Sequence, residues 1–254
     1  MNQPSNTDGL AGTTAIVTGA SRGFGRGIAA ALAAAGAQVV GVARTSAHLD
    51  DVHDELGDTF TAVTADAADP ATATRLIDEY RPRTVVLAAG AAPKMSPLHE
   101  QTWESFSQNW HADVAQAFHW IRHALRRPLA PGSSVIAISS GAAINGSPLS
   151  GGYAGAKATV RLIADYAAIE SERAALGISF VSVLPGLTPA TDLGAKAVAA
   201  YAERQGVGVD TFVESLRPAL TAEQVGKSVL EIATGGQRDH RAYTLTSAGL
   251  SPLA

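Results

Sequence analysis

The stretch TTAIVTGASRGFGRGIAAALAAA, residues 13–35, decides the fold. Its first six residues are a β-branched run that is typical of a strand, and its last eight are good helix formers. The glycine-rich segment between them predicts a turn that joins this strand to this helix. Such a turn brings backbone N–H groups and a helix N-terminus close to a pyrophosphate. A simple glycine turn is the alternative, but the flanking strand and helix supply the context that dinucleotide binding requires.

Six further apolar runs predict strands. They cover residues 37–43, 60–65, 83–91, 135–139, 177–186 and 242–250. Most of them are followed by a helical segment, and this alternation predicts a parallel sheet with helices on both faces and ligands at the carboxyl ends of the strands. We find no repeat or linker that divides the 254 residues, so we expect a single α/β domain.

The end of the second strand indicates which cofactor is bound. In this type of sheet, an acid there binds the ribose 2′-hydroxyl, whereas an arginine accommodates a 2′-phosphate. Arg44, followed by Thr45, takes this place, and Arg22 in the glycine turn offers a second guanidinium. We therefore expect NADP(H) rather than NAD(H); the alternative is that either arginine is merely solvated. Asp66, followed by Ala67, ends the third strand and either accepts a hydrogen bond from adenine or caps a turn.

A serine and a Tyr-x-x-x-Lys pentad follow the fifth strand. Ser140 directly follows the run VIAIS, and Tyr153 and Lys157 are four residues apart. On a helix this spacing places a phenol and an ammonium group on one face, about 5–6 Å apart at Cβ. A phenol ionises near pH ~10, and a neighbouring cation favours its anion, so such a pair can transfer a proton. An ordinary exposed pair is the alternative; the glycine turn earlier in the chain favours the catalytic interpretation.

The composition excludes several classes of protein. The net charge is −4 and the basic residues are dispersed, so we expect binding neither to nucleic acid nor to a membrane. The chain has no cysteines, which excludes disulfides and thiolate chemistry and fits a cytoplasmic protein. Residues 1–10 do not resemble a signal peptide, so we expect a flexible leader before one domain over 11–254. The alanine-rich stretch 28–43 predicts a helix, a turn and a strand rather than a membrane span.

A long helical stretch covers residues 100–127. Its apolar residues recur at a spacing of three or four and predict a buried stripe. The stripe consists of Trp103, Phe106, Trp110, Val114, Phe118 and Ile121. His119 and His123 are four residues apart, a spacing that a metal pair can use. The sequence HWIRH lacks the glutamate of the His-Glu-x-x-His pattern and a third ligand, so we expect no metal site.

In combination and order, these motifs resemble the short-chain dehydrogenase/reductase family over almost the whole chain. They are the TGxxxGxG turn at 18–25, Asp66, Ser140, the pentad from Tyr153 to Lys157, and Pro185-Gly186. The resemblance implies a single-domain Rossmann fold with a doubly wound, parallel, seven-stranded sheet. It also implies a nicotinamide cofactor, hydride transfer to a carbonyl or from an alcohol, and a homodimer or homotetramer formed through helices 100–127 and 151–176.

The resemblance implies a role for each site residue. Ser140 orients the substrate oxygen, Tyr153 gives or takes its proton, and Lys157 favours the tyrosinate and binds the nicotinamide ribose. The other implied cofactor contacts are Thr18, Gly19, Ser21, Arg22, Gly23, Phe24, Gly25, Arg44, Thr45, Asp66, Ala67, Ala89, Gly90, Pro185, Gly186 and Thr188. Of these, the last three lie beside the nicotinamide, with Thr188 contacting its carboxamide.

Three positions depart from the family pattern. The motif Asn-Asn-Ala-Gly after the fourth strand is Leu-Ala-Ala-Gly at 87–90, which loses both amides and weakens a structural contact more than the chemistry. The C-terminal Asp-Gly-Gly is Ser-Ala-Gly at 247–249, so we expect an unusual substrate end. The pattern Asn-Val-x-Gly-x-Phe places the family's helix asparagine, which supports a catalytic water relay, at Asp113. Asp113 either preserves this relay or holds Lys157 in an ion pair.

The sequence therefore predicts an NADP(H)-dependent oxidoreductase that reduces a ketone or aldehyde, or runs the reverse reaction, on a mainly apolar small molecule. Residues 187–217 combine helical patches, glycines and apolar side chains, and we expect a mobile lid that lines the substrate pocket or simply packs on the domain. The alternative from another class is a non-catalytic protein that senses NADP(H), which Asp113 motivates.

Overall fold

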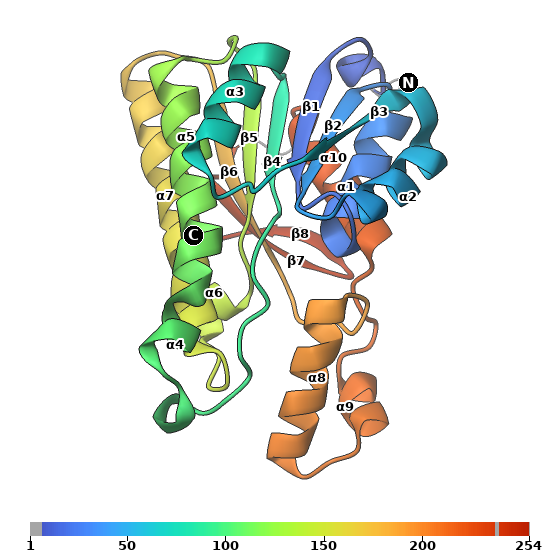
Figure 1. Ribbon diagram of the computed structural model, residues 1–254, viewed down its shortest axis with the longest axis vertical. Helices are drawn as coiled ribbons and strands as arrows, with labels where there is room; N and C mark the ends of the chain where they lie inside the picture. The colour runs from blue at the N-terminus through green and yellow to red at the C-terminus, as the bar shows by residue number, and fades with distance from the viewer. Residues whose placement is uncertain (1–6, 237–238, 254) are drawn as a thin grey trace.

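An eight-stranded sheet forms the centre of the part of the chain that is described, residues 7–236 and 239–253 of a computed structural model (Figure 1). The strand order is β3-β2-β1-β4-β5-β6-β7-β8. The strands are β1 (Thr14–Thr18), β2 (Gln38–Ala43), β3 (Phe60–Thr64), β4 (Thr84–Leu87), β5 (Ser134–Ile138), β6 (Ser179–Pro185), β7 (Ala242–Thr246) and β8 (Gly249–Pro252). The strands from β3 to β7 pair in parallel, and β8 pairs antiparallel with β7.

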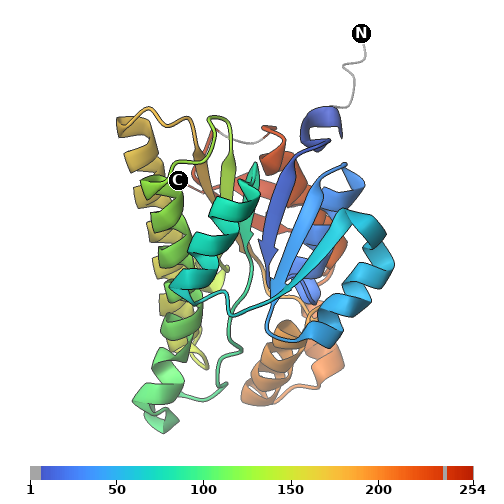
Figure 2. The same cartoon turned by 45° about the horizontal axis from the view of Figure 1, so that its top comes forward.

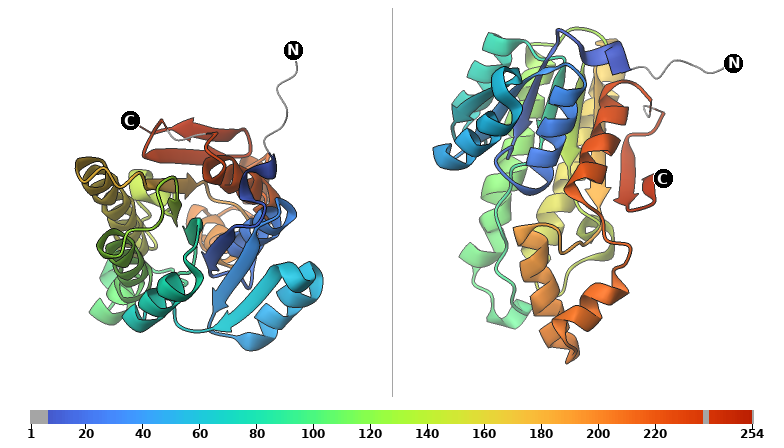
Figure 3. Two further views of the ribbon diagram at one scale, coloured as in Figure 1. Left: turned by 90° about the horizontal axis from the view of Figure 1, so that it is seen from above. Right: turned by 90° about the vertical axis from the view of Figure 1, so that its right-hand side faces the viewer.

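Helices cover both faces of this sheet (Figure 3). They are α1 (Gly23–Ala34), α2 (Ser46–Leu56), α3 (Pro70–Tyr80), α4 (Trp103–Asn109), α5 (Ala115–Arg126), α6 (Ala142–Asn145), α7 (Gly151–Arg173), α8 (Asp192–Gln205), α9 (Val209–Ser215) and α10 (Ala222–Ala233). The 3-10 turns are η1 (Thr7–Leu10), η2 (Gly57–Thr59) and η3 (Leu98–Glu100), and η4 (Trp110–Val114) is a π turn between α4 and α5. Among these described helices, none has the length and apolarity that a bilayer crossing requires.

The core consists of two clusters, one on each face of the sheet. Ala15 and Val17 of β1 belong to the cluster under α1, α2 and α10, whereas Ile16 belongs to the cluster under α3, α5 and α7. Successive side chains of a strand point to opposite faces, and both faces are covered here, so the strands are apolar throughout rather than alternating. The predicted doubly wound α/β fold is confirmed.

The predicted number of strands is wrong, because the single strand expected at 242–250 is a hairpin. The chain reverses after Thr246, and Gly249 has a φ of 107°, a left-handed conformation that glycine adopts without strain. Thr246 pairs with Gly249 across the turn, and β8 runs back along the edge of β7. The sheet therefore has one antiparallel edge strand beyond the seven parallel ones.

The last four residues of the predicted leader form a 3-10 turn that packs on the domain. Residues 7–10 form η1, and Leu10 is buried against the α1 side of the core. Figure 2 shows this turn at the start of β1. The remainder of the predicted leader, residues 1–6, lies outside the described residues.

The sequence analysis predicted a buried apolar stripe on the helix over 100–127, and this prediction is wrong for three of its aromatic residues. Trp103, Trp110 and Phe118 are 74%, 42% and 48% exposed. Ile121 of the predicted stripe is buried, and the other buried positions of this helix between 109 and 124 are Asn109, Asp113, Gln116, Ala117, Trp120 and Ala124. A π turn adds a residue to the helical repeat at 110–114, and the polar members of the buried side pair with backbone groups of a neighbouring loop.

Helices α1 and α10 cross at two glycines. A Cβ placed on Gly226 would lie 2.3 Å from the Gly27 carbonyl oxygen, and a Cβ on Gly27 would lie 2.4 Å from the Ala222 carbonyl oxygen. The two backbones are therefore in direct contact, and neither glycine has room for a side chain unless the helices move.

We expect Gly226→Ala to lower the free energy of unfolding by about 1–3 kcal/mol, because the added methyl group forces the helices apart. This cost exceeds the gain of up to about 1 kcal/mol that alanine brings to a helix interior. Denaturant unfolding measures the difference. Gly155→Ala in α7 is the matched control: its Cβ would lie 3.7 Å from Trp110 Cζ2, an ordinary contact, so this variant should keep or gain stability. Equal stability of Gly226→Ala and the parent would contradict the close crossing.

Candidate active site

The carboxyl ends of β1 to β6 bring most of the predicted site residues to one edge of the sheet. These residues end or follow strands: Thr18 to Gly25 at β1, Arg44 and Thr45 at β2, Asp66 and Ala67 at β3, Ala89 and Gly90 at β4, Ser140 at β5, and Pro185, Gly186 and Thr188 at β6. Parallel strands all end at the same edge, so the predicted position of a ligand site has its structural basis here. Helices α8 and α9 extend beyond this edge (Figure 1).

The glycine turn after β1 leaves no room for side chains at two positions. Gly19 has a φ of 69°, and a Cβ there would lie 2.8 Å from the backbone nitrogen of Ala89. A Cβ on Gly25 would lie 2.1 Å from the Gly19 carbonyl oxygen. Helix α1 begins at Gly23, and the side chain of its N-cap residue, Arg22, makes no capping hydrogen bond. The first-turn N–H groups of α1 therefore fit a phosphate of a dinucleotide.

The two predicted phosphate-binding arginines are both exposed. Arg22 Nη1 lies 3.1 Å from Asp192 Oδ2, at the first residue of α8, so in the structure it links the glycine turn to the predicted lid. Arg44 directly follows β2, and Thr45 is the N-cap residue of α2. Asp66 Oδ1 accepts a hydrogen bond of 2.9 Å from Ala68 N, as in the turn interpretation. The Ala67 carbonyl accepts one of 2.9 Å from Trp120 Nε1 of α5.

Two hydrogen bonds hold the end of β5 against α7. Ser139 Oγ donates to the Lys157 carbonyl at 2.7 Å, and Lys157 Nζ donates to the Ile138 carbonyl at 3.0 Å. This attachment brings Ser140, the next residue of the chain, to the part of α7 that carries Tyr153. Lys157 Nζ lies 5.7 Å from the centre of the Tyr153 ring. Ser140 Oγ accepts a hydrogen bond of 3.2 Å from Ala142 N.

Asp113 and Lys157 form a buried ion pair, with Asp113 Oδ2 at 3.3 Å from Lys157 Nζ. Burial opposes the charge and lowers the pKa of Lys157, but the carboxylate of Asp113, aided by Tyr153, raises the pKa above its ordinary value of 10.5. The other carboxylate oxygen, Oδ1, accepts a hydrogen bond of 2.9 Å from Ala91 N. Of the two arrangements left open for Asp113, the structure has the ion pair.

The site contains two polar side chains that the sequence analysis did not single out. Gln116 bonds to Thr18 and to the Ala89 carbonyl, and Asn109 bonds to the Ala91 carbonyl. With Asp113 they follow the spacing i, i+4, i+7, which places them on one helix face. This spacing was available in the sequence as a signal, but the aromatic residues of the same helix form the more conspicuous pattern.

The segment after β6 contacts the C-terminal part of the chain. Gly186 N donates to the Leu245 carbonyl at 2.9 Å, and Gly141 N donates to the Pro185 carbonyl at 2.9 Å. Thr188 is buried, and its hydroxyl donates to the Leu220 carbonyl at 2.6 Å. The predicted carboxamide contact of Thr188 would therefore use an oxygen that already donates to the chain.

The predicted lid consists of α8 and α9. Tyr201 of α8 stacks on Phe212 of α9, with ring centres 6.4 Å apart. The Tyr201 hydroxyl lies 2.5 Å from Ser147 Oγ, which in turn lies 2.6 Å from Ser150 Oγ at the start of α7. The lid therefore touches the loop before α7 at one point and the glycine turn at another.

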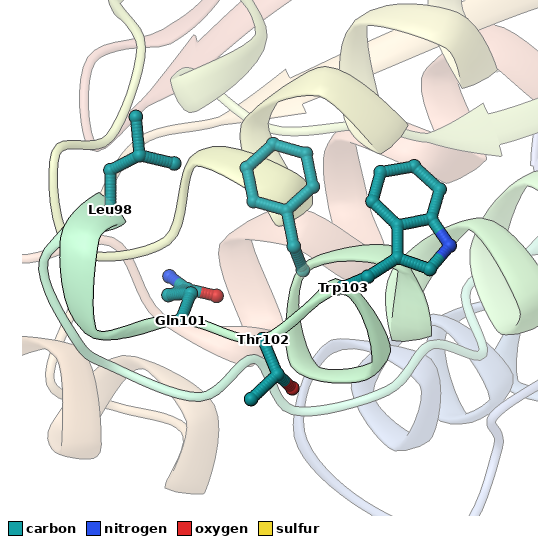
Figure 4. Close-up of a pocket in the computed structure, with 5 residues that line it drawn as sticks. Leu98, Gln101, Thr102 and Trp103 are labelled. Atoms are coloured by element: carbon teal, nitrogen blue, oxygen red, sulfur yellow. The ribbon is translucent and has the colours of Figure 1, made fainter.

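A hollow of about 270 Å³ lies along η3 and α4 (Figure 4). It is lined by Leu98, Gln101, Thr102, Trp103 and Phe106. Leu98 and Trp103 stand on either side of it, and both are largely exposed. A Cβ on Gly151 would lie 3.4 Å from the Phe106 ring, so this lining residue packs against the first turn of α7, two residues before Tyr153.

The two histidines of α5 have separate partners. His123 Nε2 lies 3.0 Å from Asp78 Oδ1 of α3, and this hydrogen bond lowers the pKa of Asp78. His119 packs edge-on against Phe118. Within residues 7–236 and 239–253, no group of three His, Cys, Asp or Glu side chains has an arrangement that could hold a metal ion.

We expect Asp113→Asn to lower the free energy of unfolding at pH 7 by about 3 kcal/mol, because it leaves a buried ammonium group without its carboxylate. In the parent, the raised pKa of Lys157 means that the ion pair stabilises fully below pH 10.5 and is lost only as the pH rises through the raised value. In the variant, burial lowers that pKa, so the penalty shrinks as the pH approaches 10.5. The difference between the two proteins should therefore decrease from pH 7 to 10.5.

Denaturant unfolding at several pH values measures this difference. Asp192→Asn is the matched control, because its carboxylate pairs with Arg22 on the surface and should matter little at any pH. A constant difference between Asp113→Asn and the parent over this pH range would contradict the role given to the ion pair.

Comparison with known proteins identifies the family. Residues 13–202 match the family model described as short chain dehydrogenase. The L-xylulose reductase of Bos taurus is 33% identical over 184 residues, which are 71% of this chain and 74% of that protein. The L-xylulose reductase of Mesocricetus auratus is 33% identical over 134 residues, 52% of this chain and 54% of that protein. The match thus spans about half the length of this second relative.

Other relatives and a solved structure agree with this match. The hydroxynaphthalene reductase arp2 of Aspergillus fumigatus is 31% identical over 159 residues, 59% of this chain and 58% of that protein. The structure of a 3-ketoacyl-(acyl-carrier-protein) reductase from Brucella melitensis, complexed with NADH, has a TM-score of 0.77 at 22% identity and covers 93% of this chain and 97% of its own. At that identity the likeness shows the fold. Since the family model covers most of the chain, including the glycine turn and the Tyr-x-x-x-Lys pentad, this chain belongs to the short-chain dehydrogenase family.

Proposed function

We propose that this chain is an NADP(H)-dependent oxidoreductase that reduces a ketone or aldehyde to an alcohol, or catalyses the reverse reaction. One observation carries the proposal: Lys157 Nζ lies 5.7 Å from the Tyr153 ring, on a helix turn fastened to the strand end that carries Ser140. This arrangement lies at the sheet edge that also holds the glycine turn. Family membership and relatives named as reductases support the same reaction class.

Each of the three side chains has a distinct task in this reaction. The bound nicotinamide supplies or accepts the hydride. The Tyr153 hydroxyl holds the proton that passes to the substrate oxygen, and the Ser140 hydroxyl donates a hydrogen bond that orients this oxygen. The Lys157 ammonium group stabilises the negative charge that Tyr153 carries after it has given up its proton. Asp113 keeps Lys157 charged, so the cation is present throughout.

The cofactor is held by the glycine turn and the arginines. The N–H groups at the start of α1 bind the pyrophosphate, and Gly19 and Gly25 let the turn pack closely against Ala89 and on itself. Arg44 and Arg22 bind the 2′-phosphate through their guanidinium groups. The Brucella melitensis reductase is complexed with NADH in its crystal structure, whereas the two arginines support NADP(H) for this chain.

The substrate is a mainly apolar small molecule. Leu187 of the lid segment is 39% exposed, and the hollow along α4 offers Leu98 and Trp103. Leu187 follows β6, and the other two side chains belong to η3 and the start of α4; apolar walls with a few placed hydroxyl groups are typical of small-molecule sites.

The protein forms a homodimer or homotetramer through α5 and α7. Exposed apolar side chains occur on both helices and on the adjoining π turn, and exposed patches of this kind mark association surfaces. They are Trp110, Phe118, Leu162, Tyr166 and Ile169.

A non-catalytic NADP(H) sensor is the second candidate function. The observation that favours it is the buried ion pair, because Asp113 holds the amine of Lys157 firmly. Calorimetric titration with NADPH and NADH, together with cofactor oxidation over a panel of cyclic and aromatic ketones, separates the two functions. Binding with turnover supports the reductase, and binding without turnover over the whole panel supports the sensor.

We expect Tyr153→Phe to lower kcat by at least about 10³-fold while the Kd for NADPH changes by less than about twofold, because only the proton-carrying oxygen is removed. Steady-state kinetics and calorimetry measure the two quantities. Tyr80→Phe is the matched control, since Tyr80 is the last residue of α3, which has no role in the proposed site or interface, and its kcat should equal that of the parent. Retained turnover in Tyr153→Phe would rule out the assigned mechanism.

We expect Arg44→Ala to weaken NADPH binding by about tenfold and to leave NADH binding unchanged, because NADH has no 2′-phosphate for the guanidinium to meet. Titration with each cofactor gives the ratio of the two Kd values. Arg75→Ala, at an exposed arginine of α3 paired with Glu79, serves as the control for the loss of one surface charge. An equal effect of Arg44→Ala on both cofactors would contradict the proposed preference.

A further inference from the structure

The loop after β4 is held by the side chains of a helix rather than by its own. Residues 87–91 read Leu-Ala-Ala-Gly-Ala, so the loop has no side-chain hydrogen-bond donor or acceptor. Its backbone groups are nevertheless paired, because the α4–α5 helix presents polar side chains to it on the buried face. The groups that this helix pairs are the Ala89 carbonyl and both backbone groups of Ala91.

Gln116 makes the first of these contacts with both ends of its amide. Its Nε2 donates to the Ala89 carbonyl at 3.0 Å, and its Oε1 accepts from Thr18 Oγ1 at 2.5 Å. Thr18 Oγ1 in turn accepts from Ala88 N at 3.0 Å and Ala89 N at 3.2 Å. Gln116 and Thr18 therefore clamp Ala88 and Ala89 from two elements that are far apart in the sequence.

Asp113 and Asn109 continue the contact along the loop. Asp113 Oδ1 accepts from Ala91 N at 2.9 Å, and Asn109 Nδ2 donates to the Ala91 carbonyl at 2.7 Å. Both side chains are fully buried, so these bonds are shielded from water. The peptide groups on both sides of Ala91 are thus fixed from the same helix face as the Ala89 carbonyl.

The loop after β4 is in direct backbone contact with the glycine turn. A Cβ on Gly19 would lie 2.8 Å from both the nitrogen and the Cα of Ala89, so the two backbones touch without intervening side chains. A shift of Ala89 therefore displaces the turn that faces the cofactor. Gln116 is the side chain that contacts both Ala89 and Thr18, the residue just before Gly19.

We propose that Gln116 is a positioning residue for the cofactor: its amide sets the distance between the loop at 88–91 and the glycine turn, and so sets the affinity for the nicotinamide dinucleotide. The inference rests on the proposed function, because it requires that the dinucleotide binds at this edge. It explains why the loop tolerates alanines: the amide that fixes it is supplied by α5. It also predicts a loss in binding rather than in the chemical step, since Gln116 touches none of Ser140, Tyr153 or Lys157 by a hydrogen bond.

The test uses Gln116→Met, which keeps the length of the side chain and removes both hydrogen bonds. Calorimetry and steady-state kinetics on the full chain should show an NADPH Kd and KM raised by about tenfold, with kcat at saturating NADPH within about twofold of the parent. In the double variant with Thr18→Val, the loss of affinity should be smaller than the sum of the single losses, because both side chains act on the same backbone groups.

Gln224→Met is the matched control. This glutamine also makes two hydrogen bonds, to Thr221 N at 2.9 Å and the Ser247 carbonyl at 3.3 Å, but it lies in the cap of α10. The Gln224→Met variant should be less stable than the parent but should bind NADPH with the same affinity. If Gln116→Met does not fold, Gln116→Asn provides the same measurement, because the shorter amide cannot span Thr18 and Ala89.

The outcomes separate this inference from the proposed function. If the parent binds NADPH and the folded Gln116 variant binds it with the same affinity, the positioning role alone is overturned. A kcat that falls in step with the affinity also overturns it, since the effect then lies in the chemistry. A parent that binds neither NADPH nor NADH overturns the proposed function, and the positioning role falls with it.

Discussion

The buried ammonium group of Lys157 is the constraint on which the rest of the site depends. An unpaired charge in a protein interior costs several kcal/mol, so partners must be delivered to it from other elements. The end of β5 supplies the Ile138 carbonyl as one partner of Lys157. The π turn at residues 110–114 supplies the Asp113 carboxylate as the other. The polar contacts of Lys157 thus fix the relative positions of β5, α7 and the α4–α5 helix. Ser140 and Tyr153 are positioned with these elements, because Ser140 follows β5 and Tyr153 belongs to α7.

Asp113 extends this constraint to the cofactor side of the site. One of its oxygens faces Lys157 and the other accepts from Ala91 N, so a single carboxylate joins the Tyr153–Lys157 helix to the loop after β4. The strand order makes this possible, because β4 lies between β1 and β5. The loop is therefore flanked by the glycine turn on one side and by the Ser140 strand end on the other. Because of this strand order, the buried ion pair of Asp113 and Lys157 connects the glycine-turn side of the site to the Ser140 and Tyr153 side.

What the sequence could predict was determined by local signals. The strands, the glycine turn and the Tyr153–Lys157 spacing are patterns within short stretches, and the doubly wound sheet follows from their order. The reversal at Gly249 was missed because β7 and β8 together read as one apolar run. Gln116 and Asn109 were missed for a different reason. Their partners are backbone groups of Ala89 and Ala91, and the sequence does not indicate which backbone groups bind a side chain, because almost every residue has the same ones. The exposed tryptophans dominated the pattern, although the buried face of the helix is partly polar.

The two ends of the site differ in how firmly they are held, and burial is the reason. The contacts at Lys157 and Gln116 lie in a water-excluded region, where hydrogen bonds and ion pairs are strong and their loss is costly. The lid is joined to the glycine turn by Arg22 and Asp192, whose side chains are 68% and 71% exposed, and solvent and salt weaken such a pair. Its other polar contact, from Tyr201 to Ser147, is a single hydroxyl pair. The polar contacts of the α8–α9 segment are therefore weaker than those of the site beneath it, which is the arrangement that the proposed role of this segment as a substrate lid requires.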